Sequence, residues 1–110
     1  MKLEVQKELD SIYPSATGDL YFGVGDGWAP LLRDLLIALK ALDLPPNFKV
    51  TDIKEKYGGL RFYTNFSNDA VDDLIDQAES KSLDVCELCG EPGEVKAKGY
   101  WLSTRCAKCR

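Results

Sequence analysis

Two cysteine pairs lie near the end of the chain: Cys86-Glu-Leu-Cys89, followed after sixteen residues by Cys106-Ala-Lys-Cys109. Each C-x-x-C turn aims two sulfurs at one point, and four thiolates make the closed tetrahedral set that a structural Zn²⁺ prefers. The C-x₂-C-x₁₆-C-x₂-C spacing falls within the range of known zinc sites. The sequence therefore predicts one structural zinc ion, with all four cysteines as its ligands: Cys86, Cys89, Cys106 and Cys109.

The four cysteines could also serve as disulfides or as a redox motif, but the sequence favours neither. Two disulfides would need an oxidising compartment, but the chain begins with charged residues and shows no apolar leader, so a reducing cytoplasm is expected. A thioredoxin-like redox motif usually has one cysteine pair beside a βαβ pattern, not two pairs. A catalytic zinc is not expected, because four cysteine ligands leave no open coordination position.

Between the two cysteine pairs, residues 94–97 and 100–104 are expected to form two short strands joined around Lys98-Gly99. With the cysteine turns they make a zinc ribbon over residues 84–110. A helix runs almost directly into Cys86, so the ribbon is expected to dock on residues 1–83 rather than swing on a linker. Packing is the favoured role for Trp101, because a ribbon has little other core.

Residues 1–83 are predicted to form an α+β body. Apolar periodicity predicts three helices, at residues 2–12, 28–43 and 68–83, with Ser67 or Asn68 capping the last. The second helix has a wide leucine stripe typical of a core-facing helix: Leu31, Leu32, Leu35, Leu36, Leu39 and Leu42. Residues 48–57 and 60–66 predict an antiparallel β-hairpin across Gly58-Gly59, with a bulge in its first strand. Residues 15–18 are expected to form a loop, and residues 20–22 either a short strand or a buried loop.

The segment 19–28 contains three alternating glycines before the second helix. A phosphate-binding loop at the helix start is disfavoured, because no Gly-Lys-Ser/Thr follows and Asp26 would repel phosphate. A calcium loop is weaker still, since the acidic residues do not repeat at EF-hand spacing. The favoured interpretation is that Asp26 caps the next helix while Trp28 packs into the core.

Composition limits the function classes. The 110 residues include no histidine, which removes Ser-His-Asp and Cys-His catalytic arrangements. Because the metal would use every thiol, enzymatic activity is not expected. Residues 1–85 hold 9 positive and 15 negative charges, whereas residues 86–110 hold 5 and 3. An acidic body of this kind does not suit duplex DNA, and no apolar run approaches the roughly 20 residues that span a bilayer.

Positive charge and aromatic rings gather around the central hairpin and recur on the ribbon. Arginine and aromatic side chains anchor protein interfaces, and the same types with lysine also bind phosphates and single strands. Alternatively, the lysines only keep a solvated hairpin edge from pairing with another chain. The candidate partner-binding residues are Lys54, Lys56, Tyr57, Arg61, Tyr63 and Trp101.

Four motifs in this order resemble a group of small, uncharacterised bacterial and phage proteins: Gly25-Asp-Gly-Trp28, Ile53-Lys-Glu-Lys-Tyr-Gly-Gly-Leu-Arg-Phe-Tyr63, Ala78-Glu-Ser-Lys-Ser82 and the two cysteine pairs. The resemblance covers residues 20–110, and the hairpin segment is its most specific part. It implies a bacterial or phage cytoplasmic protein but no activity. A phage origin would suggest, by analogy, inhibition of a host protein such as a defence protein.

The sequence thus predicts an α+β fold with three helices, an antiparallel β-hairpin and a C-terminal zinc ribbon. The preferred function is a non-enzymatic, zinc-containing protein-binding module in the bacterial cytoplasm. The main alternative is a nucleic-acid-binding zinc ribbon protein that uses the lysine, arginine and tyrosine side chains. A third is a small-ligand binder or hydrolase built on the Asp26 loop.

Overall fold

The computed structural model describes residues 1–110, and it confirms the α+β class. It contains four α-helices instead of the three expected, because a short helix follows the first one. In chain order the elements are α1 (Leu3–Ile12), α2 (Pro14–Thr17), β1 (Phe22–Gly23), the 3₁₀ turn η1 (Asp26–Trp28), α3 (Ala29–Lys40), β2 (Val50–Lys56), β3 (Gly59–Thr64), α4 (Asp69–Ser82), β4 (Glu94–Lys98), β5 (Trp101–Arg105) and the 3₁₀ turn η2 (Ala107–Cys109).

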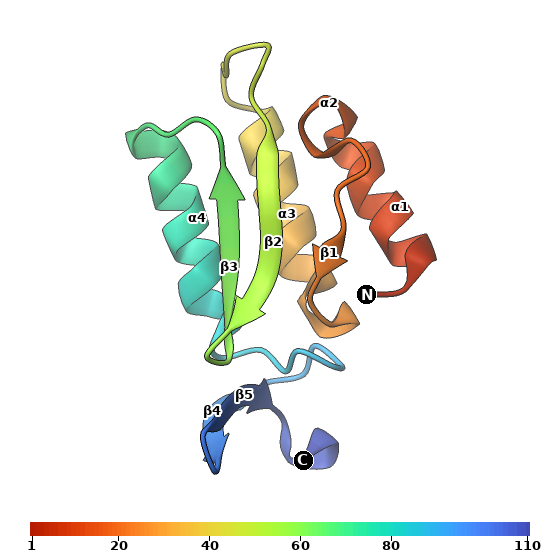
Figure 1. The fold of residues 1–110 in the computed structure, drawn as a ribbon, viewed down its shortest axis with the longest axis vertical. Helices are drawn as coiled ribbons and strands as arrows, with labels where there is room; N and C mark the ends of the chain where they lie inside the picture. The colour runs from red at the N-terminus through yellow and green to blue at the C-terminus, as the bar shows by residue number, and fades with distance from the viewer.

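A three-stranded sheet in the order β1-β2-β3 forms the centre of the body, residues 1–83 (Figure 1). Strands β2 and β3 are the expected antiparallel hairpin, and the predicted bulge is confirmed by a register shift between Val50 and Asp52. The third strand, β1, lies where a short strand was one of the two expectations for residues 20–22, and it pairs in parallel with β2 through Phe22 and Ile53. A two-residue strand has no periodicity of its own, so only the long-range pairing defines it.

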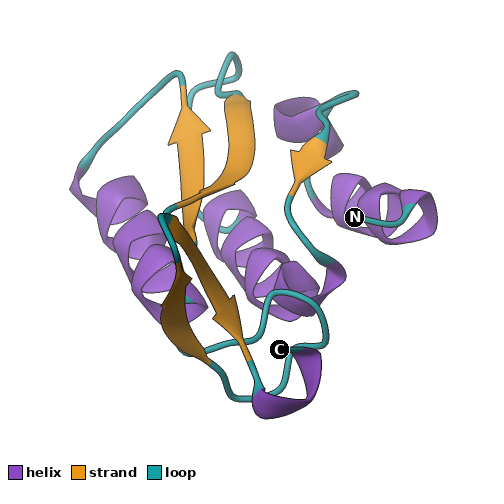
Figure 2. Cartoon of the chain, turned by 60° about the horizontal axis from the view of Figure 1, so that its bottom comes forward, coloured by secondary structure: helices purple, strands orange, loops and turns teal.

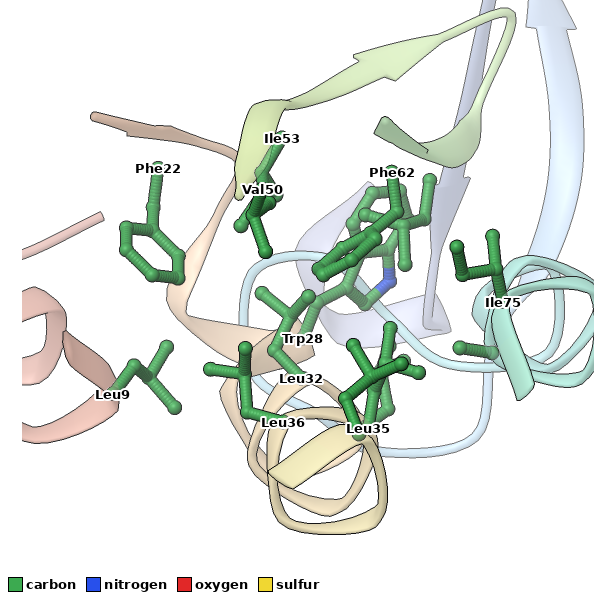
Figure 3. Packing of buried hydrophobic residues seen from close by; sticks show 14 of the residues in the cluster. Leu9, Phe22, Trp28, Leu32, Leu35, Leu36, Val50, Ile53, Phe62 and Ile75 are labelled. Carbon is green, nitrogen blue, oxygen red and sulfur yellow. The ribbon is translucent and has the colours of Figure 1, made fainter. Parts of the chain in front are cut away.

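Helix α3 lies behind the sheet in Figure 1, with α1 and α4 on either side. The five leucines of the predicted stripe that lie in α3 are buried, whereas Leu42 is half-buried and lies beyond the end of the helix at Lys40. Figure 3 shows Leu32, Leu35 and Leu36 facing the inner side chains of the sheet. Nineteen buried residues form this core, and all of them belong to residues 1–83. The body therefore has a hydrophobic core that includes no ribbon residue.

Single residues determine where two of the helices begin. The Oδ1 atom of Asn68 accepts a hydrogen bond from Val71 N at 2.8 Å, which confirms the predicted cap of α4. Tyr13 ends α1 as expected before a proline. However, Pro14 then starts α2 at its first position, where a missing N–H costs little. The prediction of a loop at residues 15–18 was therefore wrong for its first part.

Side chains cover both edges of the sheet. On the β3 edge, Leu60 N donates to Ser82 Oγ at 3.0 Å, and Phe62 N donates to Glu79 Oε2 at 3.0 Å, both from α4. On the β1 edge, Phe22 N donates to Gln6 Oε1 of α1 at 2.9 Å. The open backbone groups of edge strands invite pairing with other chains. Helix side chains occupy these three N–H groups, so protection of these edges does not depend on the hairpin lysines alone.

The outer face of the sheet carries no covering element (Figure 1). Its side chains alternate with the core residues along β2 and β3, and several of them are exposed. None of the helices combines the length with the apolar character that crossing a bilayer requires.

Candidate metal centre and partner surfaces

The four cysteine sulfurs converge at one point in the ribbon, residues 84–110. All four Sγ atoms lie within 4.8 Å of one another, and Cys89 Sγ is 3.5 Å from Cys106 Sγ. In a regular tetrahedron with Zn–S bonds of about 2.3 Å, neighbouring sulfurs are roughly 3.8 Å apart. No disulfide joins any pair. The observed spacing thus fits four thiolates around one tetrahedral metal ion, and Zn²⁺ or iron are the metals that such a sulfur set suits.

Backbone hydrogen bonds build the first cysteine turn. Gly90 N donates to Cys86 O at 2.9 Å, and Cys86 N donates to Glu91 O at 2.8 Å. Gly90 has φ +83°, a conformation that a residue with a Cβ rarely adopts. In the second turn Cys109 N donates to Cys106 O at 3.2 Å. Both turns therefore hold their sulfurs in place by backbone geometry.

The same hydrogen bonds favour thiolates. Burial alone would raise the pKa of the Cys86 thiol, but hydrogen bonds from the backbone N–H groups of Cys106, Cys89 and Leu88 outweigh it and lower the pKa to about 6. The Cys109 thiol donates to its neighbouring sulfurs, above all Cys106, and this raises its pKa to about 12. Without a metal, the Cys86 sulfur is thus favoured as a thiolate and the Cys109 sulfur as a thiol. A bound divalent cation would release the thiol protons and leave four thiolates.

The glycine-rich segment of the body forms the seat of the first cysteine turn. Gly25 N donates to Glu87 Oε2 at 3.0 Å, and Gly27 N donates to Glu87 O at 2.8 Å. A Cβ on Gly25 would overlap the same backbone carbonyl. The glycines are therefore required for close approach, and their amide groups are already paired. This pairing removes the donors that a phosphate-binding loop would use.

Glu87 is half-buried at this seat. Burial raises the pKa of its carboxyl, although the hydrogen bond from Gly25 N and the nearby Arg105 act in the other direction. Glu87 lies between two metal ligands in the sequence. One side chain thereby links the metal site to the body.

Trp28 makes a second connection from the body to the ribbon. Its ring is fully buried, as predicted, and Nε1 donates to Val85 O at 2.9 Å. The predicted helix cap by Asp26 was wrong. Asp26 lies in the preceding 3₁₀ turn, and its Oδ1 accepts from Lys2 N at 2.9 Å, while α3 has no side-chain cap. The extra 3₁₀ turn moves the start of α3 beyond the reach of Asp26.

The turn of the central hairpin is the third connection. It consists of Tyr57-Gly58, one residue earlier than predicted, and both residues have positive φ, +54° and +84°. Such a pair is typical of the type I′ turn that matches strand twist. Gly58 O accepts a 2.6 Å hydrogen bond from the buried Thr104 Oγ1 of β5. Figure 2 shows the ribbon hairpin directly below this turn.

The structure divides the candidate partner residues between two surfaces. Lys54, Arg61 and Tyr63 lie on the outer face of the sheet, where Lys54 is paired directly with Arg61 across the strands. Tyr57 and Trp101 lie instead in a groove between the two hairpins. Lys56 lies on β2 and lines that groove too, at the boundary between the two surfaces.

The packing role favoured for Trp101 was wrong, because 68% of this side chain is exposed. The fully buried residues of the ribbon are instead Thr104 and Cys86. Tyr100, in the ribbon turn, is exposed and belongs to the charged and aromatic surface expected on the ribbon, whereas the exposed Tyr21 on the sheet face was not among the candidates. Neighbouring side chains in an extended segment point to opposite faces, so the buried Phe22 would have indicated that Tyr21 is exposed if β1 had been identified as a strand.

Searches against protein-family models, curated proteins and solved structures find no match to this chain. A function must therefore be argued from the chemistry of its own surfaces, because a fold class alone does not imply one.

Proposed function

We propose that this chain is a non-enzymatic, zinc-stapled module that binds a protein partner through the groove between its two hairpins. The groove has a volume of about 330 Å³, and we call it the tip groove. Its lining combines the end of the central hairpin with the ribbon turn: Glu55, Lys56, Tyr57, Tyr100, Trp101 and Leu102. The observation that carries the proposal is the gathering of three highly exposed aromatic rings around this one groove.

The exposure of these rings is unusual for a small domain. Tyr57 is 67% exposed, Trp101 is 68% exposed, and Tyr100 has no cover at all. Tyrosine and tryptophan are the side chains most enriched at the energetic centres of protein interfaces. Charged residues are depleted in such centres, and the rim of the tip groove carries only Glu55 and Lys56. This composition supports a protein partner.

Backbone conformation gives independent support. Tyr57 is the only non-glycine residue with positive φ, at +54°. A bulky residue in this region costs on the order of 1–2 kcal/mol. Outliers of this kind cluster at ligand-binding and switch regions. An asparagine would make the same turn more easily, so the tyrosine ring is better explained by a role in binding than by folding.

The metal supports the proposal through the position of the ribbon. Two of the three exposed rings, Tyr100 and Trp101, belong to β5 and its turn, and the cysteine cluster lies at the other end of this hairpin, where Arg110 also donates to Glu94 O and Arg105 O. A Zn²⁺ ion would supply a structural cross-link there, and a closed set of four thiolates offers it no position for a substrate or water. The chain contains no histidine to serve as a general base. These features favour a structural metal and no catalysis.

The test is capture of partners from a nuclease-treated bacterial lysate, the source that the resemblance to bacterial and phage proteins indicates. The bait is the zinc-loaded full chain, and the comparison is with Trp101→Ala. Tyr21→Ala is the matched control, because Tyr21 is exposed to 69% but lies on another surface. We expect the original protein to capture a partner that Tyr21→Ala also captures and that Trp101→Ala does not. Chemical cross-linking of the captured complex should join this partner to Tyr57 or Tyr100. Equal capture by all three proteins would contradict a role for the tip groove.

A further inference from the structure

We propose that the outer face of the three-stranded sheet binds single-stranded nucleic acid, by stacking bases on two tyrosines beside a central lysine. This inference goes beyond the tip groove, since it concerns another surface and another class of ligand. The face consists of Tyr21, Gly23, Asp52, Lys54, Arg61 and Tyr63, and we call it the open sheet face.

Strand register defines the arrangement. Gly23 of β1 lies opposite Lys54 of β2, and Lys54 lies opposite Arg61 of β3. Neighbouring strands are about 4.8 Å apart, so this row is roughly 10 Å wide. Gly23 presents no side chain, and the Cε1 atom of Tyr21 comes within 3.6 Å of the position a Cβ would take there. The Tyr21 ring therefore lies over the glycine on the β1 side of the row.

Tyr63 occupies the opposite side. It is paired with Asp52, one step along the same face from the Lys54–Arg61 pair. The Nζ atom of Lys54 lies 5.4 Å from the centre of the Tyr63 ring and 3.5 Å from Asp52 Oδ2. Tyr21, which immediately precedes β1, and Tyr63 of β3 thus flank a lysine on the middle strand, and Arg61 adds a second cation.

This composition fits a single strand better than the other partners. Sites for single strands combine aromatic rings, on which bases stack, with cations along the backbone path. The open sheet face has both, in a body with 15 negative and 9 positive charges over residues 1–85. Its tyrosines and arginine would suit a protein interface as well, but it holds no exposed aliphatic side chain, and its lysine and aspartate are of types depleted in such interfaces. A duplex would need more cations than two.

Pairing of an extended peptide at the sheet edges is already blocked. Ser82 and Glu79 occupy the outward N–H groups of β3, and Gln6 occupies that of Phe22 in β1. A ligand of this sheet therefore meets side chains on the face and not free backbone at the edge. Stacking with charge contacts is the recognition that such a face allows.

The experiment is fluorescence anisotropy with dye-labelled oligouridylate and oligothymidylate, using the zinc-loaded full chain at low and at physiological salt. The double variant Tyr21→Ala/Tyr63→Ala should weaken binding about fivefold or more for each ring removed. Tyr21→Phe/Tyr63→Phe keeps both rings and should bind like the original protein. The two oligonucleotides show whether ribose or deoxyribose is preferred.

Charge is tested separately. Lys54→Glu/Arg61→Glu should strongly weaken binding at low salt and flatten its salt dependence, whereas Lys40→Glu/Lys81→Glu makes the same charge change on exposed helix positions and should have little effect. Trp101→Ala should bind the oligonucleotides normally, which separates this proposal from the tip groove. Circular dichroism melts establish that each variant is folded.

Several results would overturn the inference. One is the absence of saturable binding at low salt. Another is equal competition by inorganic polyphosphate or by a duplex of the same length, since either would mean attraction by charge alone. Phenylalanine variants as weak as the alanine variants would exclude stacking. If the tyrosine pair were instead needed to capture a nuclease-resistant protein, the face would be a protein interface.

Discussion

Gly27 lies so close to Cys86 that a Cβ at position 27 would overlap the Cys86 carbonyl oxygen and come within 2.6 Å of Gly90 N. A loop of the body and the first cysteine turn thus meet backbone to backbone, 59 residues apart in the sequence. The metal centre is therefore seated on the body and not merely tethered to it.

Gly27→Ala should push the first cysteine turn off its seat. We expect a loss of unfolding free energy of about 3 kcal/mol or more, because backbone must move on both sides, together with weaker metal binding. Denaturant unfolding and a metal-competition titration measure the two effects. Gly18→Ala is the control: its Cβ would meet nothing within 4 Å, so only the strain of φ +53° remains. Equal losses in both variants would show that the seat is unimportant.

Glu87 offers a test of the same seat that separates charge from hydrogen bonding. Glu87→Gln keeps an acceptor for Gly25 N and should change stability little, whereas Glu87→Ala leaves that donor without a partner and should cost about 1–3 kcal/mol. Burial raises the pKa of Glu87, so its ionisation disfavours the folded state. The neutral carboxyl of Glu87 therefore contributes to stability. This contribution is fully present below the pKa that Glu87 has in the unfolded chain, and it is lost as pH rises through the higher pKa of the folded state. Glu87→Gln should remove that pH dependence, as urea unfolding across the range above pH 4.5 can measure.

Ser82 is expected to be essential for the protected edge of β3. It is fully buried, accepts from Leu60 N and donates to Glu79 O at 2.6 Å. Ser82→Ala should therefore lower the free energy of unfolding by about 1–3 kcal/mol and increase self-association at high concentration. Ser80→Ala, on the exposed side of the same helix, should do neither. Light scattering and thermal melts report the outcome, and identical behaviour of the two variants would refute the edge argument.

Tyr57→Asn separates stability from binding. Asparagine tolerates positive φ and forms the favoured Asn-Gly turn with Gly58, so the variant should be more stable by about 1 kcal/mol. It should nevertheless bind the protein partner more weakly, because one ring of the tip groove is gone. A melting curve combined with the capture assay tests both halves. A less stable variant would mean that the ring contributes to folding.

Local chemistry explains what could be predicted from the sequence. Four cysteines at ribbon spacing identify their own cluster, and the leucine stripe of α3 identifies its buried face, because both signals repeat within a few residues. The Asn68 cap and the bulge near Asp52 are equally local. These features need no knowledge of the remaining chain.

Long-range contacts explain what could not be predicted. The parallel pairing of Phe22 with Ile53 links segments 31 residues apart and involves too few residues to leave a pattern. The alternating glycines were interpreted as a loop before a helix, although their role is to receive Glu87. Burial of Thr104 against Gly58 decides that Trp101 faces outward, and no periodicity within a five-residue strand reveals it.

The main prediction is that one Zn²⁺, held by four cysteines of the ribbon, keeps residues 84–110 folded on their seat against the body. Native mass spectrometry of reduced protein, with metal analysis, tests it most directly. We predict one zinc per chain, lost in Cys86→Ser and on chelation or acidification, because protons compete for the thiolates. Hydrogen exchange after chelation should then rise first in residues 84–110, while the core of residues 1–83 stays protected. Reduced protein that carries no metal, or a ribbon equally protected without it, would contradict the account.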